Sequence, residues 1–416
     1  MTATPPEGST PPRLDELDVT AVNRADVYKS GKLAAHLERT PNGVEFSYTR
    51  AWVDSGDPPV ATTLPVTAEP VLSAGGAVPS YFAGLLPEGR RLGALRRSIK
   101  TSADDELSLV LAVGSDAVGD VQVVPTGQAP ERAAARLQVH DFSTVRFRDL
   151  LDDLDIHVDR VGLPGVQDKV SLAMLNLPVA VAGHKYLLKL NPPEYPHVVE
   201  NEHFFLGAGR TSGIETAHAD LVHDADDTSG LVVRRFDRLT VAGEERELAV
   251  EDGCQVLDVH PEAKYRIRTE DLLAKLCSLC EAPIPAARVF LAQVVFAYVT
   301  GNGDAHAKNF SILQDIHGRW WPAPAYDVPS SQPYGDNTLA LSVAGKRDGN
   351  IPGQRYVDLG QELGLPERAA RRVVGEVARA VDDWIGGISS LPFDPGRLHK
   401  LKKVVARRQQ MLVRGY

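Results

Sequence analysis

Residues 289–299 read Val-Phe-Leu-Ala-Gln-Val-Val-Phe-Ala-Tyr-Val and are apolar at all but one position. Pro285 precedes this run where a helix can start, and Gly301 follows it where a helix can end. A helix that is apolar on every side is buried in a large core. The pattern therefore predicts a buried helix that delivers the polar loop at residues 301–310 to a fixed place.

Apolar and polar residues alternate in the first part of the chain, which is typical of half-buried strands. Strands are predicted at residues 25–37 (a pair around a Ser-Gly turn), 44–48 and 118–125, and helical segments at 80–86 and 90–97. No catalytic grouping occurs among these residues. An interaction or scaffold role is the default expectation for this part of the chain.

The rest of the chain changes from a mixed pattern to a helical one. Strands are predicted at residues 170–175, 185–190 and 231–238, and helices at 143–154, 198–208, 366–385 and 395–413. The pattern is helical from residue 268 onwards, except in the loop at 301–310 and in the segment 315–355. We therefore expect a disordered tail (1–22), a β-rich subdomain (23–135), an α/β region (136–258) and a helical C-terminal lobe (259–416).

Composition narrows the class of protein. Hydrophobic residues make up 43 % and charged residues 24 % of the 416 residues, as in soluble globular proteins. The formal charge of −10 does not indicate a surface that binds nucleic acid as a whole. The basic run in the last predicted helix is usually a solvated face, with a DNA or acidic-protein contact as the alternative.

Location and redox state follow from the same sequence. The N-terminus has neither a basic start nor an apolar run, and no uninterrupted run of about 18 apolar residues predicts a membrane span. The three cysteines are few and odd in number, which argues against a disulfide framework. This count fits a cytoplasmic protein. Cys277 and Cys280 have the spacing of half a zinc site, but no second pair exists. We expect a packed thiol pair.

The polar loop after the apolar helix carries the strongest chemical signal. Asp304 and Asn309 are separated by four residues, as in a kinase catalytic loop, where the Asp accepts the substrate proton and the Asn holds a metal. A strand-like run downstream ends in Asp327, which is placed to supply the second oxygen ligand that Mg²⁺ needs. An ordinary Gly-Asn-Gly-Asp turn is the alternative.

A second group of residues suggests phosphate binding. The tight loop at 160–169 contains Gly165 and Lys169, and its backbone amides can cradle phosphate oxygens, although a plain hairpin turn has the same composition. Lys189 lies in an apolar strand and needs an acidic or phosphate partner. Glu202, on the next helix, is within reach of it, as in the strand–helix ion pair of kinases. Alternatively, Lys189 extends to solvent from an edge strand.

The strand at residues 231–238 ends in charged residues and is expected to connect two lobes, with its backbone beside an adenine ring. Arg234, Arg235 and Asp237 have a simpler alternative, which is to pair with one another.

Taken together, these segments resemble the HipA-type serine/threonine kinases, the toxins of type II toxin–antitoxin systems. The motifs that carry the resemblance are Gly165-Val-Gln-Asp-Lys-Val-Ser, Leu188-Lys-Leu, Glu200-Asn-Glu, Arg235-Phe-Asp-Arg, Glu251-Asp-Gly-Cys-Gln, Lys264-Tyr and Gly301-Asn-Gly-Asp-Ala-His-Ala-Lys-Asn-Phe, with Phe82-Ala-Gly-Leu-Leu-Pro-Glu-Gly and Val113-Gly-Ser-Asp-Ala-Val-Gly-Asp in the N-terminal unit. The resemblance extends over nearly the whole chain from about residue 24.

The resemblance implies an α+β, two-lobed protein-kinase-like fold with a β-rich N-terminal subdomain and an all-helical C-terminal lobe. It also implies ATP and Mg²⁺. Asp304 would be the catalytic proton acceptor, and Asn309 and Asp327 would hold the metal. The nucleotide-binding residues implied are Pro164, Gly165, Val166, Gln167, Asp168, Lys169, Lys189, Arg234, Arg235, Phe236, His306, Ala307, Lys308, Asn309, Tyr326 and Asp327.

Family members phosphorylate proteins of translation, notably aminoacyl-tRNA synthetases, and arrest growth. They are neutralised by a HipB-type antitoxin, which binds operator DNA and would carry this protein's main contact with DNA. One residue departs from the pattern of many relatives: Gly162 stands where they have an autophosphorylated Ser. We therefore expect this chain to lack that form of self-inactivation.

Two other functions fit parts of the sequence. The Gly-Asp-x-His-x-x-Asn pattern also resembles the catalytic loop of aminoglycoside and phosphoinositide kinases, so a small-molecule kinase is the first alternative. The second is a partner-binding co-repressor with a silent kinase site, which the intact Asp304, Asn309, Asp327 and Lys189 argue against. The sequence does not identify the phosphorylated target, the antitoxin or the oligomeric state.

Overall fold

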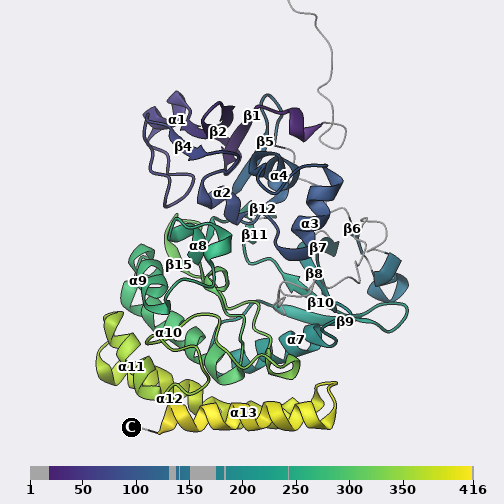
Figure 1. Cartoon of the computed structure of the whole chain (residues 1–416), viewed down its shortest axis with the longest axis vertical. Helices are drawn as coiled ribbons and strands as arrows, with labels where there is room; N and C mark the ends of the chain where they lie inside the picture. Colours follow the sequence, from purple (N-terminus) through teal and green to yellow (C-terminus); the bar gives the residue numbers. More distant parts are fainter. Residues whose placement is uncertain are drawn as a thin grey trace, which may run out of the picture.

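The computed structural model describes residues 18–130, 137–139, 141–149, 175–181, 184–241 and 243–414. Figure 1 shows three tiers along the long axis: the N-terminal unit, a middle tier of strands, and a helical lobe closed at its far end by α13. The predicted phosphate loop (164–169) and Gly162 lie outside the described residues, as do residues 150–154 of the helix predicted at 143–154 and residues 170–174 of the strand predicted at 170–175.

The N-terminal unit is built on a five-stranded antiparallel sheet. Its strands are β1 (Arg24–Lys29), β2 (Lys32–Thr40), β3 (Gly43–Tyr48), β4 (Val71–Ala74) and β5 (Val121–Pro125), in the order β4-β3-β2-β1-β5. The turn between β1 and β2 places Ser30 and Gly31 at φ angles of 48° and 77°, which match the right-handed twist of a hairpin. The strand pair predicted around this turn is confirmed.

Four helices, α1 (Arg50–Ser55), α2 (Ser80–Gly84), α3 (Gly89–Ser98) and α4 (Glu106–Val113), complete this unit. Phe46 from the sheet and Phe82 from α2 are both about 1 % exposed or less and pack with their ring centroids 5.7 Å apart. Burial of such aromatic side chains is what fixes α2 against the sheet. The loop that follows α2 is thereby held at the boundary with the middle tier.

A second five-stranded sheet forms the middle tier. Its strands are β6 (Leu137–Gln138), β7 (Leu175–Val181), β8 (His184–Leu190), β9 (Ala219–His223) and β10 (Ser229–Arg234), in the order β6-β7-β8-β10-β9. Because β8 pairs with β7 on one side and β10 on the other, it is not an edge strand. The 14-residue helix α7 (Val198–Thr211) contacts β9 and β10. Lys189 therefore lies at the centre of a sheet, beside a helix.

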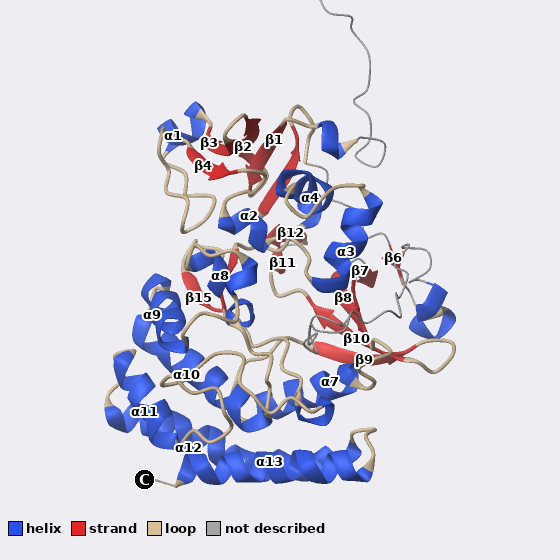
Figure 2. Cartoon of the chain, viewed as in Figure 1, coloured by secondary structure: helices blue, strands red, loops and turns tan. Residues whose placement is uncertain are grey.

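The C-terminal lobe contains the helices α9 (Thr269–Leu279), α10 (Pro283–Thr300), α11 (Gly353–Glu362), α12 (Glu367–Trp384) and α13 (Pro395–Val413), as the blue segments of Figure 2 show. The helix α10 is the apolar rod predicted from residues 289–299, and it starts at Pro283. Its length of 18 residues and mean hydropathy of 1.4 suit a membrane span, but 61 % of it is buried inside the protein. It is therefore the central helix of a packed core.

Short strands link the polar loop at residues 301–310 to the rest of the molecule. They are β11 (Arg238–Val241) with β12 (Glu244–Glu247), and the sheet of β13 (Val250–Asp252), β14 (Ser311–Gln314) and β15 (Trp320–Pro322). The short helix α8 (Gly253–Val256) follows β13 directly. A Cβ atom on Gly253 would lie 2.5 Å from the carbonyl oxygen of Ala307, so only a residue without a side chain allows this approach.

Two predictions about local chemistry can be compared with the fold. The thiols of Cys277 and Cys280 are buried and free, and burial raises the pKa of each to about 12, which confirms a packed pair. The basic run on α13 is not wholly a solvated face: Arg408 is 2 % exposed and donates to the carbonyl oxygens of Tyr298 and Asn337. This arginine ties α13 to the end of α10.

Candidate active site

The polar loop at residues 301–310 starts where α10 ends. Gly301 adopts a φ of 75°, and a Cβ there would lie 2.5 Å from the side chain of Gln332. The side-chain oxygen of Asn302 accepts the backbone N–H of Asp304 at 3.0 Å, while its amide donates to the carbonyl oxygen of Asp327 at 3.1 Å. One asparagine therefore sets the distance between the loop and the segment that carries the second predicted carboxylate.

Asp304 and Asn309 are both buried, at 3 % and 8 % exposure. The side-chain oxygen of Asn309 accepts the N–H of His306 at 3.0 Å, and its amide nitrogen lies 3.5 Å from Oδ2 of Asp327. Asn309 and Asp327 are thus neighbours, with the amide nitrogen of Asn309 facing the carboxylate, and their role as two oxygen ligands of one metal stays a prediction. Asp304 precedes both in the chain and accepts a hydrogen bond from the hydroxyl of Tyr265 at 2.7 Å.

Lys189 joins the same group of side chains from the sheet. Its Nζ lies 2.8 Å from Oε1 of Glu202 on α7 and also contacts Oδ1 of Asp327. Burial opposes the charge on this ammonium, but the two carboxylates outweigh that effect and raise its pKa. The pair with Glu202 is the ion pair expected from the sequence, and the alternative of an edge-strand lysine in solvent is wrong.

Lys189, Asn309 and Asp327 line a cavity of about 380 Å³ between the tiers of the molecule. Of the residues predicted to bind a nucleotide, those that line it are Lys189, Arg234, Arg235, Phe236, His306, Lys308, Asn309, Tyr326 and Asp327. Two other residues of the loop, Ala307 and Asp304, are buried and do not line the cavity. The predicted phosphate loop at 164–169 lies outside the described residues.

The connector after β10 contains the pairing that the simpler interpretation predicts, and it also lines the cavity. Arg235 pairs with Asp237 at 2.8 Å, as the simpler alternative proposed, and also with Asp116 of the N-terminal unit at 3.1 Å. Phe236 packs against Tyr326 with a centroid separation of 5.6 Å. The connector therefore places an aromatic wall in the cavity and fixes it through buried arginine pairs.

Lys308 lines the cavity, but its ammonium is held by other groups. Its Nζ donates to Oδ2 of Asp252 at 2.6 Å and to the carbonyl oxygen of Gly84 at 2.9 Å. Burial works against its charge, yet the carboxylates of Asp252 and Glu88 raise its pKa. The catalytic loop is thus fastened to α8 and to the N-terminal unit by one buried cation.

The N-terminal unit contributes part of the cavity wall, which the sequence analysis did not predict. Its lining residues are Gly84, Leu85, Leu86, Pro87, Glu88, Arg91, Val113, Asp116, Ala117 and Val118. Most of these fall within the two N-terminal motifs that resemble the family, so the motifs were the available signal. Their role could not be read from spacing, because they contain no catalytic pair.

The donor set at Asn309 and Asp327 fits a magnesium ion better than a transition metal. Among the described residues there is no group of three or more His, Cys, Asp or Glu side chains that could form a complete metal cage. Mg²⁺ commonly takes only one or two carboxylate ligands from protein and completes its shell with phosphate oxygens and water. Asp327 and the amide oxygen of Asn309 would be sufficient for that arrangement once the Asn309 side chain turns, because in this structure its oxygen accepts the N–H of His306 and its nitrogen faces Asp327.

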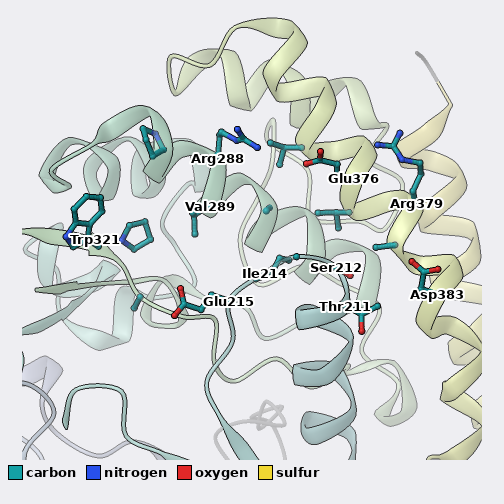
Figure 3. Close-up of a pocket in the computed structure, with 18 of the residues that line it drawn as sticks. Thr211, Ser212, Ile214, Glu215, Arg288, Val289, Trp321, Glu376, Arg379 and Asp383 are labelled. Atoms are coloured by element: carbon teal, nitrogen blue, oxygen red, sulfur yellow. The ribbon is translucent and has the colours of Figure 1, made fainter. Parts of the chain in front are cut away.

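A larger groove lies on another face of the helical lobe and shares no lining residue with this cavity. Figure 3 shows it between Thr211–Glu215 at the end of α7, Arg288 and Val289 on α10, Trp321 on β15, and the α12 residues Glu376, Arg379 and Asp383. Its polar side chains carry both signs of charge, and it contains neither the acid–amide pair nor a buried lysine. We therefore place the chemistry in the smaller cavity.

Comparison with known proteins gives a consistent result. Residues 161–385 match the family model described as the HipA-like C-terminal domain, and residues 25–124 match the HipA N-terminal domain. The chain is 28 % identical over 383 residues to the serine/threonine-protein kinase toxin HipA of Shewanella oneidensis, covering 83 % of this chain and 86 % of that protein. It is 29 % identical over 414 residues to the Sinorhizobium fredii protein Y4mE, covering 93 % and 98 %.

The fold agrees with that of a solved structure. The Shewanella oneidensis HipA, determined in a complex with HipB and its operator DNA, superimposes with a TM-score of 0.75 at 22 % identity, over 93 % of this chain and 96 % of that one. The predicted α+β kinase-like architecture is therefore confirmed. With both domain models matched in order, this chain belongs to the HipA family of serine/threonine kinase toxins.

Proposed function

We propose that this protein transfers the γ-phosphoryl group of ATP to a serine or threonine hydroxyl of a protein involved in translation, such as an aminoacyl-tRNA synthetase, and so arrests growth. The observation that carries the proposal is the contact of Lys189 with both Asp327, in the cavity, and Glu202, buried behind it, with Asn309 beside Asp327. Those four side chains in that relation are what phosphoryl transfer from a nucleotide requires.

Asp304 is the proposed proton acceptor. As the substrate oxygen forms its bond to the γ-phosphorus, the bond between that phosphorus and the bridging oxygen of ADP breaks, and the hydroxyl proton passes to the Asp304 carboxylate. The carboxylate is 3 % exposed, so little bulk water competes for the proton. A positioned base of this kind contributes on the order of 10²–10⁴ in rate.

The other residues act by position and charge. Lys189 would contact the nucleotide phosphates, with the backbone amides of residues 164–169 cradling them and Arg234–Phe236 lying beside the adenine. Asn309 and Asp327 would hold Mg²⁺, which neutralises charge on the phosphates. Buried pairs with Glu202 and Asp237 already hold Lys189 and Arg235, so these two side chains need little reorganisation when the nucleotide binds.

The proposed partners follow from family membership. The Shewanella oneidensis relative was solved with HipB and operator DNA, which supports a HipB-like antitoxin for this chain and contact with operator DNA mainly through it. We place the protein in the cytoplasm, where its substrates would be. With Gly162 in place of a serine, we propose that neutralisation relies on the antitoxin and not on phosphorylation of that loop.

The experiment compares the purified protein with its Asp304→Asn variant in a cell lysate supplied with γ-labelled ATP. A protein band labelled only by the parent, on Ser or Thr, is the expected result. Labelling of small alcohols without labelled protein would instead make this a small-molecule kinase. If the parent transfers no phosphate and fails to bind Mg-ATP at micromolar concentration, the proposal is wrong and a silent co-repressor is favoured.

A further inference from the structure

We infer that Tyr265 is a positioning residue that holds the carboxylate of Asp304 in its working orientation. Its hydroxyl donates a hydrogen bond to Oδ1 of Asp304 over 2.7 Å, from a position 39 residues earlier in the chain. The inference rests on the function proposed above, since it assigns a role toward the base of that reaction. It concerns a residue that contacts the base and not the nucleotide cavity, which Tyr265 does not line.

The backbone of Asp304 is already fixed on both sides. Its N–H donates to Asn302, and its carbonyl oxygen accepts the N–H of His306 at 2.8 Å. These backbone contacts do not restrict rotation of the Asp304 side chain about its own bonds. A phenol that donates to one carboxylate oxygen fixes the direction of the other, which is the geometric requirement for a base that must meet one hydroxyl.

Tyr265 is itself held from several directions. Its ring packs edge-on against the imidazole of His306, with centroids 5.1 Å apart at 75°. Its carbonyl oxygen accepts a hydrogen bond from Arg347, and the carbonyl oxygen of the preceding Lys264 accepts the N–H of Ala307 at 3.2 Å. These contacts hold the Tyr265 ring against the catalytic loop, and the phenol cannot turn away without breaking them.

An ion pair with the N-terminal unit also holds the segment that carries Tyr265. The ammonium of Lys264 forms an ion pair with Glu88, which follows α2, and lies 5.3 Å from the centre of the Tyr265 ring. Glu88 in turn lines the nucleotide cavity. The segment that carries Tyr265 is therefore anchored to the same N-terminal loop that forms one wall of the cavity.

Burial and the neighbouring carboxylate keep the Tyr265 hydroxyl protonated, so that it can donate its hydrogen bond. Burial first, and then the Asp304 carboxylate, raise the pKa of this phenol well above its usual range. It stays protonated at any pH at which the protein would be assayed. A hydrogen bond to a charged group contributes more than one between neutral groups, so its loss should be measurable in the rate.

The test is Tyr265→Phe, which removes one oxygen atom and keeps the ring against His306. With the protein substrate identified as above, we expect kcat to fall about tenfold, since a hydrogen bond to a charged group is lost. The KM for ATP should stay within about twofold, because Tyr265 does not line the cavity. Tyr298→Phe is the matched control, because it also removes a hydroxyl hydrogen bond, to Gly349, but outside the site.

A second comparison separates positioning from general structure. In an Asp304→Asn background, Tyr265→Phe should lower the residual rate no further, because groups that act as a unit are not additive. If Tyr265→Phe does not fold, Arg347→Gln decides: this exposed residue anchors the Tyr265 backbone, and its variant should lower kcat about threefold with an unchanged KM for ATP.

The outcomes are distinguishable. An active parent with an unchanged kcat in Tyr265→Phe, or a further rate loss in the Asp304→Asn background, overturns the role of Tyr265 and leaves the kinase function standing. A rise in the KM for ATP without a fall in kcat also overturns it, because the residue would then act on nucleotide binding. A parent that transfers no phosphate overturns both proposals.

Discussion

Lys189 on β8 and Glu202 on α7 form a buried ion pair, with Nζ 2.8 Å from Oε1, at exposures of 4 % and 1 %. The same ammonium contacts Asp327, which comes from the segment after β15. One cation thus joins two consecutive elements to a segment that lies 138 residues further along the chain. The pair makes the position of Lys189 depend on α7, and the position of Asp327 depend on Lys189.

Replacing Lys189 by Met should reduce both activity and stability. Loss of one preorganised positive group typically lowers kcat by about 10²–10³. The buried carboxylate of Glu202 would also lose its partner, which costs about 3–5 kcal/mol when a buried pair is broken. Transfer rates and denaturant unfolding test the two effects. Lys185→Met is the control, because Lys185 lies on the same strand, pairs with Asp116, and does not line the cavity; equal losses in both variants would contradict the assignment.

Replacing Asp327 by Asn should change how the rate depends on Mg²⁺. The variant keeps the shape of the side chain but removes the charge that a hard cation prefers, so more Mg²⁺ should be needed for half-maximal rate. We expect a loss of at least about 10²-fold at millimolar Mg²⁺, of the size found when one charge-stabilising group is removed. The exposed Asp383 supplies the control variant Asp383→Asn. An unchanged magnesium dependence would exclude Asp327 as a ligand.

Glu251 predicts a pH dependence of stability at the contact between the N-terminal unit and β13. Its buried carboxylate accepts the N–H and hydroxyl of Thr62 at 2.8 and 2.6 Å. Burial raises its pKa from 4.5 to about 7. Between these values the native state binds a proton that the unfolded chain releases, so the free energy of unfolding falls as the pH rises from 4.5 to 7.

The Glu251→Gln variant isolates that contribution. Titrations at other residues cancel when the parent and variant are compared, and the parent should lose up to about 3 kcal/mol relative to the variant between pH 4.5 and 7.5. Denaturant unfolding at several pH values measures this difference. A difference that stays constant with pH would mean that folding does not raise the pKa of Glu251.

Lys308 tests whether the N-terminal unit supports catalysis. Lys308→Met removes the hydrogen bonds from the catalytic loop to Gly84 and Asp252, and leaves the Asp252 carboxylate without its cation. We expect kcat to fall about tenfold or more, since a displaced loop misplaces the base. Rates at saturating ATP measure this effect, with the exposed Lys346→Met as the control. A rate equal to that of the parent would show that the loop keeps its position without this contact.

Local chemistry made much of this site predictable. The apolar run and its Gly301 cap predicted α10 and the place of the polar loop, because helix signals depend on neighbouring residues. Period-two alternation placed Lys189 among apolar neighbours, and the cost of burying an unpaired ammonium predicted a carboxylate partner. Glu202 could then be chosen, since it lies on the next helix in the chain.

What the sequence did not reveal depends on contacts between distant segments. The hydrogen bond from Lys308 to Gly84 spans 224 residues, and the Tyr265–Asp304 bond spans 39. Neither has a periodic or spacing signal, because each is made only when separate units pack together. The N-terminal wall of the cavity was therefore assigned a scaffold role, and the burial of Arg408 within a basic helix was missed for the same reason.

The close approach of α8 to the catalytic loop has a consequence for how variation in this family should be interpreted. Gly253 would touch no substrate, nucleotide or metal, yet a single added methyl group would push against the backbone that carries the base. Natural or engineered variants with a larger residue there should therefore resemble active-site mutants in the proposed phosphoryl-transfer assay. Loss of transfer at such a position would be misattributed to chemistry unless the shape of the backbone is considered first.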